Sequence, residues 1–201
     1  LTWLRSAQER DITCAGALTD AKGDRAKAPS AQDDKDVFLH LVEKRKDGIV
    51  VRGAKLMICG VAAANEIFII PGTGYKEDET DFALSFVIPR DIEGLTIVET
   101  RHPSDTRDEE DGFDNPVKEG GITQSFLFFE NVFIPNERVF MCGETKYTMS
   151  TIGYFIGPYR AAIGGCVAGQ GDIKIGSAIL TARANGLSSK VFADKLTQMY
   201  I

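Results

Sequence analysis

The sequence has little of the material from which several common kinds of site are built. It contains two histidines and four cysteines in 201 residues, and no two cysteines form a CxxC pair. Widely spaced cysteines in a chain of this length do not indicate a disulfide framework, so we expect a reducing, cytoplasmic setting. With two histidines no Ser-His-Asp or Cys-His arrangement can be argued, and the sequence has neither a GxGxxG motif nor a P-loop.

Long apolar runs and an excess of positive charge are also missing. No run of about 18 apolar residues is present, and the start does not resemble a signal peptide, so we predict no membrane partner. The net charge of −6 argues against non-specific nucleic-acid binding, because no overall positive field attracts phosphate, but it leaves room for a local basic pocket. The chain begins at Leu1 and stops at Ile201 without a helix-end signal, so we expect truncation at both ends.

Strand patterns dominate the middle of the chain. Hydrophobic residues make up 43% of the sequence, which is enough for a core. Short apolar runs recur between residues 37 and 134, separated by turn signals such as the Asp-Gly pair at 47–48 and the Pro-Gly pair at 71–72. Strands at this spacing predict a compact β barrel or sandwich.

Helical spacing replaces the strand pattern near residue 142. Residues 147–163 and 173–184 carry apolar side chains at intervals of a helical turn. A β-rich part followed by helices is typical of an α+β protein. We therefore predict the end of an N-terminal helical domain at 1–11, a β-barrel middle domain at 12–141 and the start of a C-terminal helical domain at 142–201.

Two segments combine glycine with charge and could hold an anionic ligand. In the first, residues 16–32, glycines let the backbone approach a ligand, and phosphate could bind to Lys22, Arg25 and Ser30. The second is Arg52-Gly53-Ala54-Lys55 at the end of a predicted strand, where charge beside glycine often marks the edge of a site. A polar surface loop and a solvated strand end are the alternatives that the pattern alone leaves open.

Two further features suggest other chemistry. Cys166 follows two glycines in helical sequence, where a thiolate could bind iron or zinc, although close helix packing accounts for the same pattern. His40 and His102 lie in distant segments, so the local metal signal is weak. Six carboxylates crowd residues 105–114, where an acid–base pair is conceivable and a solvated loop is the simpler interpretation.

Several longer segments resemble one group of flavoenzymes. They are residues 19–25, 28–32, 42–45, 47–55 and 131–138, and Gly164-Gly165-Cys166 with Gly171-Asp172. On these segments, which extend over nearly the whole chain, the sequence resembles the 4-hydroxybutyryl-CoA dehydratase family and, more distantly, the flavin-dependent 4-hydroxyphenylacetate 3-hydroxylases. Both have an acyl-CoA dehydrogenase-like architecture, so the resemblance implies a β-barrel middle domain followed by the start of an α-helical bundle.

The resemblance implies FAD as the cofactor. In the family, a loop that matches residues 22–25 and 29–32 touches the flavin cofactor, and a strand end that matches residues 55–59 lies near the isoalloxazine. The implied cofactor-binding residues are Lys22, Gly23, Asp24, Arg25, Pro29, Ser30, Gln32, Lys55 and Cys59. FAD usually sits between subunits in this architecture, so the resemblance also implies a homotetramer.

The dehydratases also use a [4Fe–4S] cluster held by three cysteines and one histidine, and Cys166 matches one of these cysteines. The position of the histidine is Tyr159, and two catalytic positions of the family, a glutamate and a tyrosine, are Gln124 and Ile163. Neither replacement can exchange a proton, so the resemblance does not imply strict dehydratase chemistry. The hydroxylases place a substrate-binding histidine at the position of Gly16.

Three functional hypotheses follow. The first is a FAD enzyme of the dehydratase branch with altered chemistry on an acyl-CoA or similar small molecule. The second is a flavin-dependent hydroxylase or other oxidoreductase that acts on a phenolic acid with reduced FAD from a partner reductase. The third is a non-catalytic or degenerate family member. Residues 124, 159 and 163 favour the second and third hypotheses, whereas overall similarity favours the first.

Overall fold

The computed structural model describes residues 2–100, 124–187 and 190–200. It divides into two compact units, Leu1–Ile152 and Gly153–Ile201, and each unit is described by itself. His102 and the acidic stretch at 105–114 lie outside the described residues.

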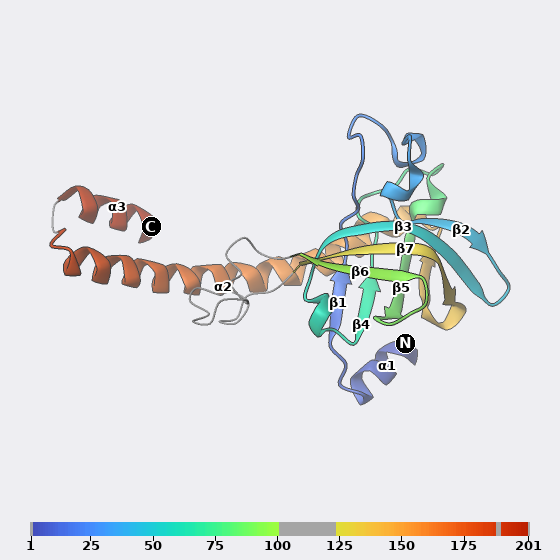
Figure 1. Cartoon of the computed structure of the whole chain (residues 1–201), viewed down its shortest axis with the longest axis horizontal. Helices are drawn as coiled ribbons and strands as arrows, with labels where there is room; N and C mark the ends of the chain where they lie inside the picture. The colour runs from blue at the N-terminus through green and yellow to red at the C-terminus, as the bar shows by residue number, and fades with distance from the viewer. Residues whose placement is uncertain (1, 101–123, 188–189, 201) are drawn as a thin grey trace. The chain divides into compact units, whose positions relative to one another are not determined.

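The first unit is built from two four-stranded sheets (Figure 1). The first sheet has the order β1 (Cys14–Ala17), β4 (Glu66–Ile69), β5 (Leu84–Pro89), β8 (Val139–Cys142). The second sheet has the order β2 (His40–Lys44), β3 (Gly48–Cys59), β7 (Gln124–Pro135), β6 (Leu95–Thr100). The β1–β4 pair is parallel, and every other pair within these sheets is antiparallel.

Short 3₁₀ helices and one α-helix complete the first unit. The α-helix is α1 (Thr2–Glu9). The 3₁₀ helices are Pro29–Ala31, Lys35–Val37, Val61–Ala63, Thr80–Phe82, Asn136–Arg138 and Thr145–Tyr147. Two of them lie in the segment between β1 and β2, which therefore has backbone structure of its own.

The core lies between the two sheets, whose strands cross in Figure 1. Alternate residues point into it, as the two-residue period of a strand requires: in β7, Leu127 and Phe129 are buried while Phe128 is 40% exposed. Phe129 meets Phe86 of the first sheet edge to face, with ring centroids 6.3 Å apart. Such pairs of large apolar residues hold the two sheets together.

The predicted closed barrel is not confirmed. A barrel requires every edge strand to be paired, but among the described strands no ladder joins the edges of one sheet to those of the other. The two sheets instead cover one another's apolar faces, which is the sandwich that the strand spacing also allowed. Outside the named strands, an isolated bridge between Asp20 and Lys55 links the chain after β1 to β3.

One irregular strand, β7, contains two of the apolar runs of the sequence. Residues 125–129 and 132–134 both belong to β7, whose pairing with β3 shifts register between Val51 and Gly53. Asn131, at φ 55°, takes up the irregularity as a bulge. The bulge restores the inward direction of Val132 and Ile134, both of which are buried.

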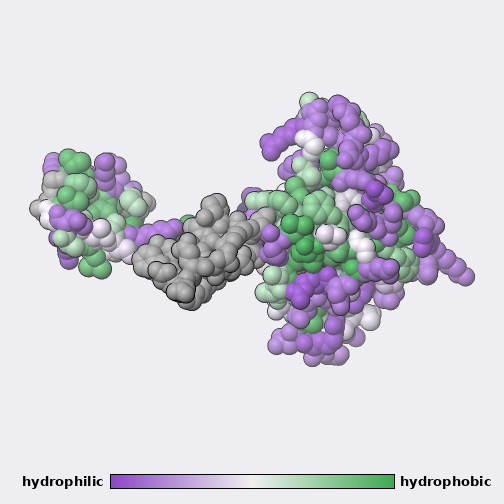
Figure 2. All heavy atoms as spheres, viewed as in Figure 1, coloured by the Kyte–Doolittle hydropathy of each residue, from purple (hydrophilic) through white to green (hydrophobic). Residues whose placement is uncertain are grey.

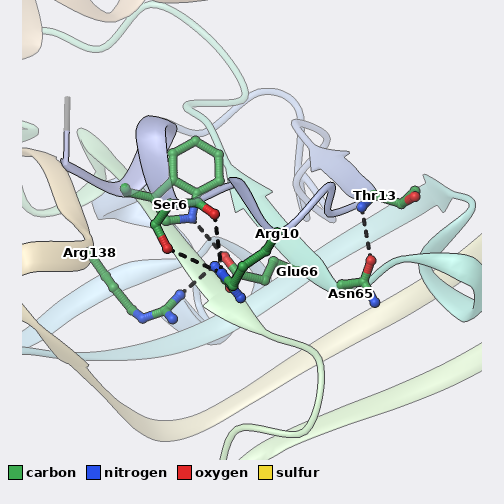
Figure 3. Close-up of polar contacts among 7 residues, drawn as sticks. Ser6, Arg10, Thr13, Asn65, Glu66 and Arg138 are labelled. Carbon is green, nitrogen blue, oxygen red and sulfur yellow. Dashed lines mark hydrogen bonds and ion pairs between the residues drawn. The ribbon is translucent and has the colours of Figure 1, made fainter. Parts of the chain in front are cut away.

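Glu66 ties α1 to the first sheet (Figure 3). Its carboxylate accepts hydrogen bonds from Trp3 Nε1 at 2.7 Å and from Arg10 at 3.0 Å. Arg138 donates a third at 3.2 Å. Burial alone would raise the pKa of Glu66, but the bonds from these three donors outweigh it and hold the pKa below its usual value.

The second unit is helical. It contains most of α2 (Thr148–Ala184), which carries Pro158 in its interior, and α3 (Lys190–Tyr200). Large apolar side chains of α2 are open to solvent, among them Tyr154 at 85% and Ile173 at 71%. Figure 2 shows further apolar residues on the visible face of α3 and the end of α2. No helix in the described part of the chain combines the length and the apolar character needed to cross a membrane.

We expect Glu66→Gln to lower the free energy of unfolding at pH 7 by about 1–3 kcal/mol, because Arg10 and Arg138 lose the negatively charged acceptor of their hydrogen bonds. The folded-state pKa of Glu66 lies below its ordinary value of 4.5, so this contribution is present above about pH 4.5 and is lost as the pH falls through the folded-state pKa. Urea unfolding between pH 7 and pH 3 measures both effects. The exposed Glu77→Gln variant is the control, and a Glu66→Gln curve identical to wild type at every pH would contradict the prediction.

Candidate functional site

A loop between β1 and β2 forms part of the wall of a cavity of about 280 Å³. We call residues 21–37 the basic loop. The cavity is lined by Asp20, Lys22, Arg25, Lys27, Pro29, Phe38, Gly72 and Thr73. Three of these side chains carry positive charge, so the cavity suits an anion. The first candidate segment of the sequence and the turn after β4 therefore meet at one place.

Two cations of the basic loop are available for a ligand. Lys22 and Arg25 are exposed, and within the described part of the chain no carboxylate lies at ion-pair distance from either. Lys27 differs, because its ammonium lies 2.6 Å from Asp33. Free guanidinium and ammonium groups beside a cavity are the donors that phosphate oxygens prefer.

The side chain of Gln32 holds the basic loop together. Its Oε1 accepts from the amide of Asp24 at 2.9 Å, and its Nε2 donates to the carbonyls of Asp24 at 2.8 Å and Lys27 at 3.1 Å. Gly23 makes this possible, since a Cβ there would lie 2.3 Å from Gln32 Oε1. Gln32, predicted to bind the cofactor, is thus buried and bonded within the loop.

The second candidate segment supports the ends of the basic loop. Arg52 Nε lies 2.6 Å from Asp36 Oδ2. Gly53, at φ 125°, lets the chain pass close to β3, because a Cβ there would lie 2.2 Å from the carbonyl oxygen of Phe38. The loop is closed at its base by a bond from the amide of Ala21 to the carbonyl of Val37 at 3.1 Å.

Lys55 lies behind the cavity and is buried. Its ammonium is 2.7 Å from Asp20 Oδ1, and it donates to the carbonyls of Leu18 at 2.9 Å and Ile70 at 3.0 Å. Burial lowers the pKa of Lys55, and the charge of Asp20 opposes that shift. The other carboxylate oxygen of Asp20 accepts from the hydroxyl of Tyr75 at 3.2 Å, and burial, together with Asp20, raises the pKa of that hydroxyl.

Other predicted site residues occupy different places. Pro29 lines the cavity, Ser30 is exposed on the same 3₁₀ helix, and Asp24 accepts from the amide of Ala26 at 2.9 Å. Cys59 is exposed at the end of β3, where it pairs in register with Gln124 of β7. Those two residues are therefore neighbours, although they are 65 positions apart in sequence order.

The predicted metal site lies in the second unit. Tyr159, Ile163 and Cys166 are spaced so that they share one face of α2. Cys166 is exposed, and the amide of Gln170 lies 3.7 Å from its sulfur. No three His, Cys, Asp or Glu side chains come together within residues 2–100, 124–187 and 190–200, so these residues do not supply the ligand set of an iron–sulfur cluster.

Sequence reasoning did not identify the turn after β4 as part of the site. Gly72 and Thr73 line the cavity, and Tyr75 bonds to Asp20. The Pro-Gly pair at 71–72 was interpreted only as a strand breaker. The sequence does contain a signal for this part of the site. Gly74 follows Gly72 and Thr73, which gives a Gly-Thr-Gly turn at the end of a strand.

Acyl-CoA dehydrogenases are among the solved structures whose fold is similar to that of this chain. The chain superimposes on an acyl-CoA dehydrogenase from Geobacillus kaustophilus with a TM-score of 0.67 over 98% of this chain and 48% of that one, at 15% identity, which shows the fold alone. Residues 1–141 match the family described as "4-hydroxyphenylacetate 3-hydroxylase N terminal". The chain belongs to this family, as its resemblance predicted.

Two of the curated relatives are enzymes of different kinds. The chain is 44% identical over 200 residues to 4-hydroxybutyryl-CoA dehydratase/vinylacetyl-CoA-Delta-isomerase of Clostridium aminobutyricum, which covers 98% of this chain and 41% of that protein. It is 39% identical over 146 residues to the oxygenase component of 4-hydroxyphenylacetate 3-monooxygenase of Geobacillus sp. (strain PA-9), covering 70% of this chain and 28% of the relative. The chain thus spans less than half the length of either relative.

Solved structures similar to this chain include both kinds of enzyme. An oxygen-tolerant archaeal 4-hydroxybutyryl-CoA dehydratase from N. maritimus matches with a TM-score of 0.89 at 33% identity, over 98% of this chain and 40% of that one. The oxygenase component of 4-hydroxyphenylacetate 3-monooxygenase, complexed with FAD and 4-hydroxyphenylacetate, matches with a TM-score of 0.81 at 25% identity, over 98% and 42%.

We expect Gln32→Glu to loosen the basic loop. The carboxylate keeps one acceptor but places negative charge against the carbonyls of Asp24 and Lys27, so local opening should become easier by about 1–3 kcal/mol. Hydrogen exchange of peptides covering residues 22–34 measures this opening. The matched control is Gln8→Glu on exposed α1, and equal exchange in both variants would refute the role assigned to Gln32.

Proposed function

We propose that this chain forms the cofactor-binding part of a FAD-dependent enzyme, and that its basic loop binds the phosphates of FAD. The observation that carries the proposal is the cavity whose wall includes Lys22 and Arg25, two cations with no ion-pair partner among the residues that the structure describes. The complex of a family relative with FAD supports it. When bound, FAD would supply the electron-transfer chemistry that protein side chains lack.

The chemistry of the loop fits this cofactor. A diphosphate carries negative charge and several acceptor oxygens, which Lys22 and Arg25 can bind directly. Gly23 is in the left-handed region at φ 42°, and the backbone near it is exposed, so the main chain can approach a phosphate. Pro29 and Ser30 would form the side wall. Cys59, at the strand end, would lie toward the flavin ring, as the family resemblance implies.

We also propose that residues 12–141 are the middle domain of an acyl-CoA dehydrogenase-like subunit with helical domains on either side. The exposed apolar side chains of α2 support this, because a helix with Tyr154 and Ile173 open to water needs further partners to cover it. Those partners would be other helices of the same subunit and neighbouring subunits of a homotetramer in the cytoplasm.

For the reaction, we propose a member of the dehydratase branch with altered chemistry on an acyl-CoA substrate. The identity of 44% over 200 residues to the clostridial dehydratase supports this branch. Gln124, Tyr159 and Ile163 replace groups that the resemblance assigns to proton transfer and cluster binding, so the full dehydratase reaction is not proposed.

The same three residues favour a second candidate, a flavin-dependent oxidoreductase that acts on a phenolic acid and needs no iron–sulfur cluster. A non-catalytic family member is the remaining alternative. Iron and sulfide near four per subunit in the full-length protein would support the dehydratase branch. Oxygen uptake that requires NADH, a reductase and a phenol would support the second candidate. A colourless protein that binds no added FAD would reject both.

We expect Arg25→Ala to weaken FAD binding by the full-length protein by about 1.5–3 kcal/mol, which is roughly 10- to 150-fold, because a charge-assisted bond to phosphate is lost. Titration of the apoprotein with FAD, followed by flavin fluorescence, measures the affinity. Arg45→Ala is the matched control, since Arg45 is exposed in the β2–β3 turn and pairs with Glu43. An unchanged affinity in Arg25→Ala would remove this residue from the binding site.

A further inference from the structure

The ammonium of Lys55 is fully engaged inside the protein. An ammonium has three protons, and three acceptors lie at 2.7–3.0 Å: Asp20 Oδ1 and the carbonyls of Leu18 and Ile70. The side chain of Lys55 is 3% exposed, and that of Asp20 is 2% exposed. Two hydrogen bonds to carbonyls and the ion pair with Asp20 surround the ammonium, and the side chain has almost no exposed surface for a ligand in the cavity.

The three acceptors come from the elements that meet at the cavity. Leu18 and Ile70 directly follow the adjacent parallel strands β1 and β4, and Asp20 is the residue before the basic loop. The carbonyl of Thr19 also accepts from the amide of Leu56 at 2.8 Å, so main chain and side chain of β3 bind the same short segment. Lys55 therefore fixes both strand ends and the start of the loop at once.

Asp20 also contacts the opposite wall of the cavity. A Cβ at Gly72 would lie 2.0 Å from Asp20 Oδ2, so the turn after β4 packs directly on the carboxylate. The hydroxyl of Tyr75 binds the same oxygen. The position of Asp20 thus determines where Gly72 and the first residues of the basic loop can lie.

We propose that Lys55 is a positioning residue, which holds Asp20 at the base of the basic loop and so places Lys22 and Arg25 for a phosphate-bearing ligand without touching that ligand. The inference rests on the proposed function of the loop as the FAD phosphate site.

The test compares Lys55→Met with the double variant Lys55→Met/Asp20→Asn in the full-length protein. The single variant leaves a buried carboxylate without its partner and should lower the unfolding midpoint, whereas the double variant removes both charges and should recover part of that loss. Trypsin cleavage after Lys22, Arg25 and Lys27, followed by mass spectrometry without FAD, reports the order of the loop. FAD titration reports affinity, and the exposed Lys46→Met is the matched control.

If Lys55 is a positioning residue, both variants should show faster cleavage of the loop and about tenfold weaker FAD binding. Saturating FAD should then restore protection of the loop against trypsin. If the double variant recovers normal affinity together with its stability, Lys55 is structural only and the proposal fails. If affinity falls while cleavage stays at the rate of wild type, Lys55 contacts the ligand and the proposal also fails. A wild-type protein that binds no FAD would overturn the proposed function. The cleavage rates would still show whether Lys55 orders the loop, because cleavage is measured without FAD.

Discussion

The ion pair between Lys55 and Asp20 is the constraint on which the site depends. Moving an ammonium and a carboxylate out of water is costly, and the attraction between them offsets that cost only when the remaining hydrogen-bonding capacity is also satisfied. Here the carbonyls of Leu18 and Ile70 and the hydroxyl of Tyr75 satisfy it. The ion pair is therefore stable only where the ends of β1 and β4 and the turn after β4 come together. Its presence fixes these three elements relative to one another.

The rest of the first unit supplies rigid elements around this point. The two sheets pack through large apolar pairs such as Phe86 with Phe129, and the Asp20–Lys55 bridge joins the chain after β1 to the inner strand β3 beside the cavity. Glu66 fixes α1 to the start of β4, at the opposite end of the strand from Ile70. The basic loop is thereby attached to a scaffold whose strands cannot shift without breaking buried contacts.

Local patterns in the sequence predicted a large part of this structure. Apolar runs and turn residues located most strands, and the glycine-and-charge segment located the loop, because these signals depend on neighbouring residues. The partner of Lys55 was not predictable in this way, since Asp20 lies 35 positions earlier and its pairing depends on how β3 passes β1. Gln32 was predicted to bind cofactor, yet its amide is used within the loop, and the pattern alone gives no means of telling these roles apart. The barrel prediction is not confirmed, and local patterns could not decide it, because the pairing of edge strands is a long-range property.

An acidic chain can still present a cationic site if its acids are neutralised internally. The chain carries a net charge of −6, and the loop region contains several aspartates. Three of them are paired with cations: Asp20 with Lys55, Asp33 with Lys27 and Asp36 with Arg52, each at 2.6–2.7 Å. These pairs neutralise three of the aspartates around the loop, and Lys22 and Arg25 are left exposed to solvent. The electrostatic field at the cavity therefore depends on which charges are paired. The net charge of the sequence does not reveal it.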